Sequence, residues 1–152
     1  MSEETDYYNE YHVRLLLDAG ADINLTDKQG RTALSFACII DCTELVKILI
    51  SVGARPTLPT PRISTPLAWV LNHNNSDILE ALIGAGLDIN EVEPDGMTAI
   101  TRIIKVGDGN FQTKLFIEHG GDLENKANGW NALIQAIHNG RKQIVSLLLK
   151  DN

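Results

Sequence analysis

The chain has 152 residues, of which 43% are hydrophobic, and a formal net charge of -7 at pH 7. It is long enough for one domain, and its acidic balance argues against general nucleic-acid affinity, because such binding depends on Lys and Arg that neutralise phosphates. The sequence shows neither a signal peptide nor an apolar run near about 18 residues, so we expect a cytoplasmic protein without a membrane span.

The first predicted element is a helix over about residues 11–19, which ends at Gly20 because glycine accepts the left-handed conformation that closes many helices. The segment before it, MSEETDYYNE, contains four carboxylates, and we expect it to form a solvated end. A short polar stretch with the sequence DKQG then leads to the next apolar run.

This passage from an apolar helix to a glycine and a polar turn recurs along the chain. Gly20, Gly53 and Gly86 are equally spaced, and Gly120 follows after an interval that is longer by a single position. A second landmark repeats with the same period. Its copies are Thr32-Ala33-Leu34, Thr65-Pro66-Leu67, Thr98-Ala99-Ile100 and Asn131-Ala132-Leu133. Two landmarks that share one period, of about 33 residues, indicate a tandem array of repeats.

Each unit is predicted to contain two helices. In the second unit Gly30 permits a turn with positive φ, and Thr32 caps a short helix that places Leu34 and Ala37 on one face. A second helix, apolar over a wide arc, then runs to Gly53. Neither helix hides its apolar surface alone, so neighbouring units must stack.

The unit resembles the ankyrin repeat, which has a turn with Asp and Gly, a Thr-Pro-Leu-His-like helix start, an Ala-rich first helix, a Leu-rich second helix and a closing Gly-Ala-Asp. The match lies in Asp27, Gly30, Thr32, Leu34, Ala37, Glu44, Val46, Leu49, Gly53 and Ala54, again in Thr65-Pro66-Leu67, and in Gly20-Ala21-Asp22-Ile23-Asn24. The resemblance implies an all-α solenoid of stacked helix-turn-helix units with projecting turns, about four full repeats plus a partial N-terminal one. It implies a single domain, 1–152, with a partial repeat at 1–25 and repeats at about 26–58, 59–91, 92–124 and 125–152.

Several units depart from the repeat pattern. The first has at most a truncated first helix. In the third, Ile63 occupies the place of the turn glycine and four of the five prolines fall in RPTLPTPRISTP, so we predict a stiff projecting finger. The fourth gains a residue around VGDGN, which leaves its helix register open. The last ends at Asn152 in place of a glycine and carries polar residues expected of a capping repeat, namely Arg141, Lys142, Gln143 and Ser146.

In ankyrin arrays the turns project as fingertips, and the first helices line a concave groove beside them. On the fingertips the resemblance selects Lys28, Gln29, Arg31, Arg62, Ser64, Asp95, Met97, Asn128 and Trp130. In the groove it selects Phe36, Ile39, Ile40, Trp69, Asn72, His73, Arg102, Lys105, Val106, Gln135, His138 and Asn139. We predict that this surface is partner-binding, and that a partner protein contacts the large side chains that the repeat does not need for packing.

The strongest candidates on this surface are Trp130 and Trp69, because Trp is enriched among binding hot spots. A structural interpretation also stands, in which Trp69 or Phe36 packs against the next repeat. Five basic residues map to the surface and favour a partner with an acidic patch, namely Lys28, Arg31, Arg62, Arg102 and Lys105. Random scatter of surface charge is the alternative.

No pattern in the sequence predicts catalysis or metal binding. The four histidines lie in different units without ligand spacing, GDGN lacks the remaining ligands of a calcium loop, and no phosphate loop or nucleophile elbow is present. Cys38 and Cys42 are expected to be small buried thiols rather than a disulfide. We therefore expect no enzyme activity, no cofactor and no metal.

The sequence predicts a non-catalytic protein-protein interaction module that acts by occupancy, as an inhibitor, an immunity-type protein or an adaptor. Two alternatives remain open: a binder of anionic ligands or nucleic acid that uses the basic groove, and a fragment of a longer ankyrin scaffold. In the absence of its partner we expect a monomer.

Overall fold

The computed structural model describes residues 3–56, 66–73, 75–92, 96–106, 110–126 and 129–150. Its helices are α1 (Glu3–Asp18), α2 (Ala33–Ile39), α3 (Thr43–Ser51), α4 (Pro66–His73), α5 (Ser76–Gly84), α6 (Ala99–Val106), α7 (Asn110–Glu118), α8 (Ala132–His138) and α9 (Lys142–Leu148). Within these ranges no strand forms, and an isolated bridge joins Val92 to Thr98. The predicted all-α class is confirmed.

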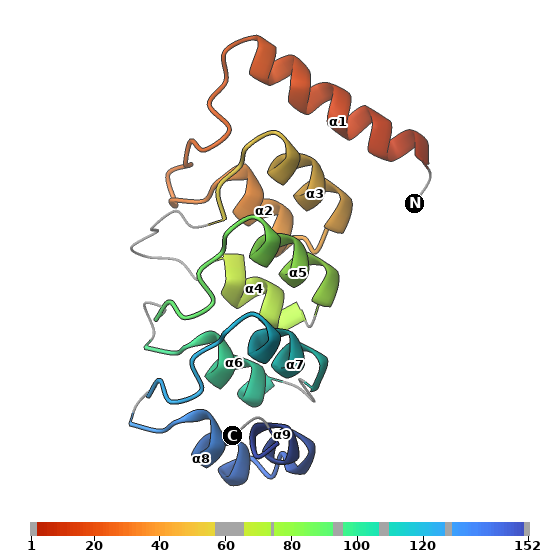
Figure 1. Cartoon of the computed structure of the whole chain (residues 1–152). Coiled ribbons are helices and arrows are strands. Elements are labelled where there is room, and N and C mark those ends of the chain that lie inside the picture. Colours follow the sequence, from red (N-terminus) through yellow and green to blue (C-terminus); the bar gives the residue numbers. More distant parts are fainter. Residues whose placement is uncertain are drawn as a thin grey trace.

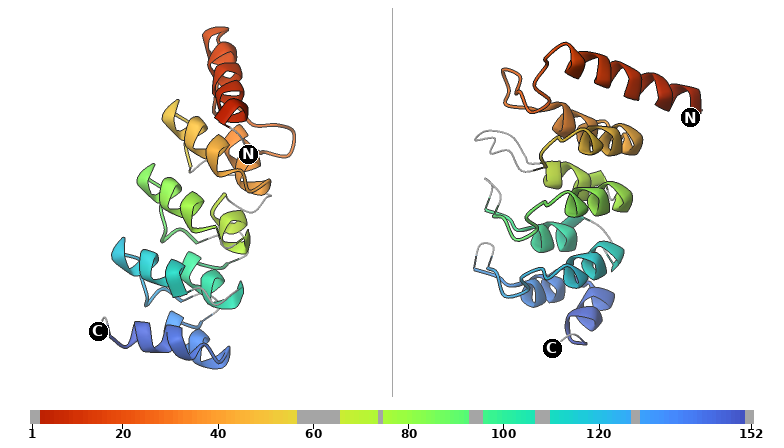
Figure 2. Two further views of the ribbon diagram at one scale, coloured as in Figure 1. Left: turned by 90° about the vertical axis from the view of Figure 1, so that its right-hand side faces the viewer. Right: turned by 45° about the horizontal axis from the view of Figure 1, so that its top comes forward.

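The helices form two parallel columns (Figures 1 and 2). An inner column stacks α2, α4, α6 and α8, and an outer column stacks α1, α3, α5, α7 and α9. Each helix of the inner column from α2 onward pairs with the outer helix that follows it in sequence. The described parts of the loops between units, such as 19–32 and 85–92, project on one side, and α1 lies at the opposite end of the array from α8 and α9 (Figure 1).

Burial follows the predicted faces of the helices. In the second unit Leu34, Ala37 and Val46 have no exposed surface, and Leu49 retains 2%. Small residues on the inner helix let the next pair approach closely, while leucines of the outer helix fill the space between the columns. The core is therefore a continuous apolar layer between units rather than one centre.

Turns and caps begin α2, α6 and α8 as the repeat pattern predicts. Gly30, Gly96 and Gly129 adopt φ values of 81°, 78° and 81° at the turns. The hydroxyl of Thr32 accepts a hydrogen bond from the backbone N–H of Ser35 at 3.1 Å and caps α2. These local signals fix where each unit starts. Ile63 and the predicted proline finger lie largely outside the described residues.

The first helix begins earlier than predicted. α1 spans Glu3–Asp18 rather than starting near residue 11, so the helix includes the acidic segment from Glu3 onward. Carboxylates close to a helix N-terminus are favoured by the partial positive charge there, which explains why this segment extends the helix. Val13 packs against the core. No inner helix accompanies α1 in the described part of its unit.

Three of the four polar residues predicted to form a cap on the last unit face the preceding unit. The Arg141 guanidinium donates Nε–H to the carbonyl of Ile104 at 3.2 Å and so points back into the preceding unit. Gln143 and Ser146 lie on the side of α9 that faces α7, beside Lys114. Lys142 is exposed.

Candidate functional site

A row of exposed side chains runs along the inner column. Ile40, His73, Val106 and Asn139 occupy one repeat position, each a single period after the last, at the ends of the four inner helices. All four are exposed, Ile40 by 51% and Val106 by 42%. We call these residues the groove row. Two of the four are apolar, although no core contact requires them to be.

Side chains beside the groove row extend the same surface. Lys105 and His138 are exposed, whereas Ile39 is partly buried. These residues precede members of the groove row by one position and share its repeat register. The structure does not describe the side chain of Asn72, which completes this register in α4.

A second predicted set does not line the groove. Phe36, Trp69, Arg102 and Gln135 also share one repeat position. Phe36 lines the hollow between α2 and α1, so this position faces the preceding unit. Arg102 is 8% exposed, and Trp69 and Gln135 are partly buried. The indole Nε1 of Trp69 is sealed from solvent and makes no hydrogen bond within the described part of the chain. Phe36 is 47% exposed because no inner helix precedes α2.

The first fingertip is held by an ionic turn. Asp27 accepts hydrogen bonds from the backbone N–H groups of Gln29 at 2.8 Å and Arg31 at 2.9 Å, and it pairs with the Arg31 guanidinium at 2.7 Å. The backbone hydrogen bond from Arg31 contributes most to lowering the pKa of the Asp27 carboxyl. The guanidinium also lies over the ring of Phe36, 5.6 Å from its centroid. Lys28 is exposed at the same turn.

Met97 and Trp130 share a repeat position but differ in exposure. Met97 is 8% exposed, so its predicted place on a fingertip surface was wrong. Its side chain is apolar and flexible, and it turns inward beside the Val92–Thr98 bridge rather than towards solvent. Trp130 is 40% exposed.

A ring contact connects the last fingertip with the groove. The rings of Trp130 and His138 lie 4.7 Å apart between centroids, with an interplanar angle of 75°. This edge-to-face arrangement fixes the orientation of the indole while leaving part of it accessible. The sequence placed both residues on the binding surface, but the contact between them depends on the α8 geometry.

The predicted basic surface is reduced in the structure. Lys28 and Lys105 are exposed, Arg31 pairs with Asp27, and Arg102 is buried. Arg62 and Ser64 lie outside the described residues, as do Asp95 and Asn128. Because two of the four described cations are buried or paired, the exposed positive charge that remains is Lys28 at a fingertip and Lys105 beside the groove row, without a dense cluster.

The two thiols have different environments. Cys38 is buried and Cys42 is partly buried, and both are free, as the sequence predicted. Burial raises the pKa of the Cys38 thiol to about 12, with a smaller contribution from Asp41. Among the described residues, His, Cys, Asp and Glu side chains form no group of three or more able to hold a metal ion. No helix in the described ranges is long and apolar enough to cross a membrane.

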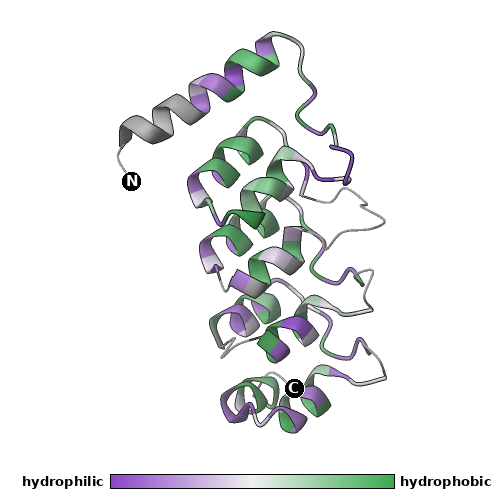
Figure 3. Cartoon of the chain, turned by 180° about the vertical axis from the view of Figure 1, so that it is seen from behind, coloured by the Kyte–Doolittle hydropathy of each residue, from purple (hydrophilic) through white to green (hydrophobic). Residues whose placement is uncertain are grey.

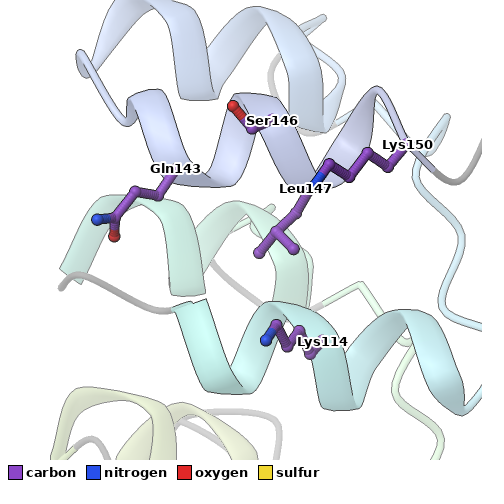
Figure 4. A pocket seen from close by; sticks show the side chains of 5 residues that line it. All are labelled: Lys114, Gln143, Ser146, Leu147 and Lys150. Atoms are coloured by element: carbon purple, nitrogen blue, oxygen red, sulfur yellow. The ribbon is translucent and has the colours of Figure 1, made fainter.

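Among the described residues, hollows open on the surface away from the groove row. One of about 290 Å³ lies between α7 and α9 and is lined by Lys114, Leu147 and Lys150 among others (Figure 4). Another, of about 240 Å³, lies between α3 and α5. The third, of about 600 Å³, lies above α2 and below α1, at the place where a first inner helix would pack. Sequence reasoning noted the missing helix but did not predict this hollow.

Comparison with known proteins identifies the repeat. The family model described as Ankyrin repeats (3 copies) matches residues 5–92 and 67–152. The chain is 30% identical over 145 residues to the putative ankyrin repeat protein YahD of Escherichia coli (strain K12), a match that covers 91% of the chain and 72% of that protein. It is 33% identical over 101 residues to the ankyrin repeat domain-containing protein 63 of Mus musculus, over 64% of the chain and 26% of that protein.

A third relative is the B-cell lymphoma 3 protein homolog of Mus musculus, with 24% identity over 146 residues. The match covers 91% of the chain but 32% of that protein. The chain thus spans about a quarter to a third of the length of both mouse relatives. The similarity to these relatives therefore concerns their repeat region.

Proposed function

The chain belongs to the ankyrin-repeat family, and on this premise we propose that it is a non-catalytic module which binds a partner protein through the groove row and the neighbouring fingertips. Ankyrin repeats are protein-interaction units in general. We propose further that the chain acts by occupancy, as an inhibitor, an immunity-type protein or an adaptor, because stacked repeats present their exposed side chains as one extended surface.

The groove row supports this proposal most directly. Ile40 and Val106 keep apolar surface exposed at a position where the fold has no packing use for it. Trp130, oriented by His138, adds a large aromatic surface at one end of the row. Apolar and aromatic anchors in a fixed geometry are the features that concentrate binding energy in protein interfaces.

Charge favours a protein partner over nucleic acid. Lys28 and Lys105 can attract an acidic patch on a partner, but two exposed lysines neutralise few phosphates. The net charge of -7 also repels a polyanion such as nucleic acid. We therefore propose that cations steer the partner and that apolar contacts retain it.

The test is capture of the partner from the native cell, followed by binding measurements with variants. Trp130→Ala should weaken binding roughly tenfold or more, because truncation removes a half-exposed aromatic anchor. Phe111→Ala is the matched control, since Phe111 is 57% exposed but lies on the outer helix α7. The control should bind the partner as the unmodified chain does.

Two results would count against the proposal. Equal losses in Trp130→Ala and Phe111→Ala would place the partner elsewhere than on the groove. Binding that falls steeply with salt and is competed by nucleic acid would favour the polyanion alternative.

A further inference from the structure

Hollows at two equivalent places in the repeat open on the outer column. One lies where α3 packs on α5, and the other lies where α7 packs on α9 (Figure 4). Figure 3 shows hydrophilic residues, in purple, along the outer helices beside the hydrophobic residues that fill the core. Because the repeat period relates the two hollows, their side chains correspond position by position.

The hollow between α3 and α5 is neutralised by its own side chains. Its lining consists of Lys47, Asp77, Glu80 and Ala81. The Lys47 ammonium also lies 3.8 Å from the carboxylate of Glu44 on α3. Three carboxylates therefore accompany one ammonium, and this hollow offers an anion no net attraction.

The hollow between α7 and α9 has no carboxylate among the described residues of its lining. These residues come from both helices: Lys114, Gln143, Ser146, Leu147 and Lys150. Gln143 has on α9 the place that Asp77 has on α5. Ser146 has the place of Glu80. Neutral hydrogen-bonding groups thus stand where the other hollow has its acids.

The same hollow has two ammonium groups. Lys114 has the place of Lys47, and Lys150 supplies the second ammonium. Both lysines are exposed, and neither forms an ion pair in the described part of the chain. Lys114 does not pair with Glu80, at the corresponding place on α5, or with Glu118, one turn further along α7. Two positive charges without an ionic partner therefore line one hollow.

The polar side chains of this hollow suit a phosphate group. Ammonium groups only donate hydrogen bonds, and the Gln143 amide and the Ser146 hydroxyl can donate as well. A phosphate monoester carries about -1.5 to -2 charges at pH 7 and its terminal oxygens are strong acceptors. A carboxylate carries a single charge, so two ammonium groups attract it less.

The floor of the hollow adds an apolar contact. In Figure 4 the Leu147 side chain points from α9 towards α7, between the side chains of Lys150 and Lys114. The hollow measures about 290 Å³, whereas one water molecule takes about 30 Å³ in the liquid. The space therefore suffices for a phosphate together with the organic group that carries it.

We propose that the hollow between α7 and α9 binds a phosphate monoester, with Lys114 and Lys150 on the phosphate and Leu147 against the organic group. This site is separate from the groove row and goes beyond the partner binding proposed above. The net charge of -7 does not oppose it, because charges more than about 8 Å apart are largely screened at physiological ionic strength. The phosphate belongs either to a free small molecule or to a phosphorylated side chain of a protein.

Titration with phenyl phosphate, followed by NMR of the backbone amides, tests the site. The amides of Lys114, Ser146 and Lys150 should shift along one saturable curve, while those of Lys47 and Glu80 should not. Benzoate, which carries the same ring on a carboxylate, should bind about threefold more weakly or less tightly still. Inorganic phosphate should also bind more weakly than phenyl phosphate, because it lacks the ring that contacts the leucine.

Variants assign the binding to this hollow. Lys114→Gln and Lys150→Gln should each raise the dissociation constant about threefold or more, since each removes a charged donor. Lys47→Gln is the matched control, because it makes the same change in charge at the corresponding place of the other hollow, and it should leave the dissociation constant unchanged. The double variant Gln143→Asp with Ser146→Glu gives the hollow the carboxylates of its counterpart and should abolish binding. Circular dichroism checks that each variant is folded.

Three results overturn the proposal. Equal losses in Lys47→Gln and Lys114→Gln would show general charge attraction in place of a site. Benzoate that binds as tightly as phenyl phosphate would remove the preference for phosphate, and a folded protein without saturable shifts would have no site. A short peptide with a central phosphoserine distinguishes the two sources. Binding tighter than that of phenyl phosphate supports the site as one for phosphorylated proteins, and equal or weaker binding supports it as one for small phosphate esters.

Discussion

The unit formed by α4 and α5 and the unit formed by α6 and α7 have the same helix pair but different interiors. In the first, the described buried positions are occupied by apolar residues such as Leu67, Ile78 and Leu82. In the second, five buried residues are polar: Thr98, Thr101, Arg102, Gln112 and Thr113. The stacking of neighbours therefore determines which positions are buried, whatever side chain occupies them.

In the unit formed by α6 and α7, some of the buried polar residues have hydrogen-bond partners and others have none among the described residues. The Thr101 hydroxyl donates to the carbonyl of Thr98 at 2.8 Å and accepts from the backbone N–H of Thr98 at 2.9 Å. The Gln112 Nε2 and the Thr113 Oγ1 are buried without a partner among the described residues. The unit of α4 and α5 has one such atom among its described residues, the Nε1 of Trp69. Because an unsatisfied buried polar group reduces stability, the unit of α6 and α7, with the two atoms of Gln112 and Thr113, should be the weaker neighbour.

The largest expected loss of stability concerns two core positions that hold different residues in the two units. Phe116 stands where α5 has Leu82, and Gly121 stands where the earlier unit has Leu87. A Cβ at Gly121 would overlap the ring of Phe116. Gly121→Ala should therefore reduce the free energy of unfolding by about 1–3 kcal/mol, as overpacking does. Urea unfolding measures the change.

The double variant Gly121→Ala with Phe116→Leu separates the clash from any other cost of removing the glycine. It restores a leucine at the place where the neighbouring unit has one, so most of the lost stability should return. Failure of the second substitution to restore stability would show that Gly121 is required for its backbone and not for the space it leaves.

The period of the repeats predicts local features of the fold but not the direction in which each helix face points. The constant spacing of the repeats placed Thr32, Gly30 and the buried Leu34 correctly, because turns and caps are local signals. It did not separate the side of an inner helix that faces the groove from the side that faces the preceding helix. Arg102 was therefore expected in the groove although it is buried. Only the stacking direction distinguishes these two sides.

The register of α7 was open for a related reason. One additional residue falls in the connection at 107–109, and its position decides whether Gln112 and Thr113 face the core or solvent.

A smaller effect concerns the unsatisfied hydroxyl of Thr113. Val46 has the corresponding place in α3 and is fully buried. Thr113→Val should raise the free energy of unfolding by about 1 kcal/mol, because it removes an unpaired polar atom at nearly constant volume. The reverse change, Val46→Thr, should lower it by about 1–3 kcal/mol. Thermal unfolding of the two variants should therefore shift in opposite directions, and a shift in the same direction would contradict the assignment.

The smallest effect concerns the loop that joins the two units. The Asn90 side chain accepts a hydrogen bond from the backbone N–H of Asp122 at 2.7 Å and donates to the carbonyl of Gly120 at 3.4 Å. Asn90→Ala should cost about 0.5–1.5 kcal/mol of unfolding free energy, the usual net worth of such bonds. Glu124 has the same place in the next unit, but its side chain accepts from Asn131, which begins the last unit, and makes no hydrogen bond with Asp122. Glu124→Ala should therefore leave the contact between Asn90 and Asp122 unchanged, and hydrogen exchange at the amide of Asp122 should accelerate in the Asn90 variant alone.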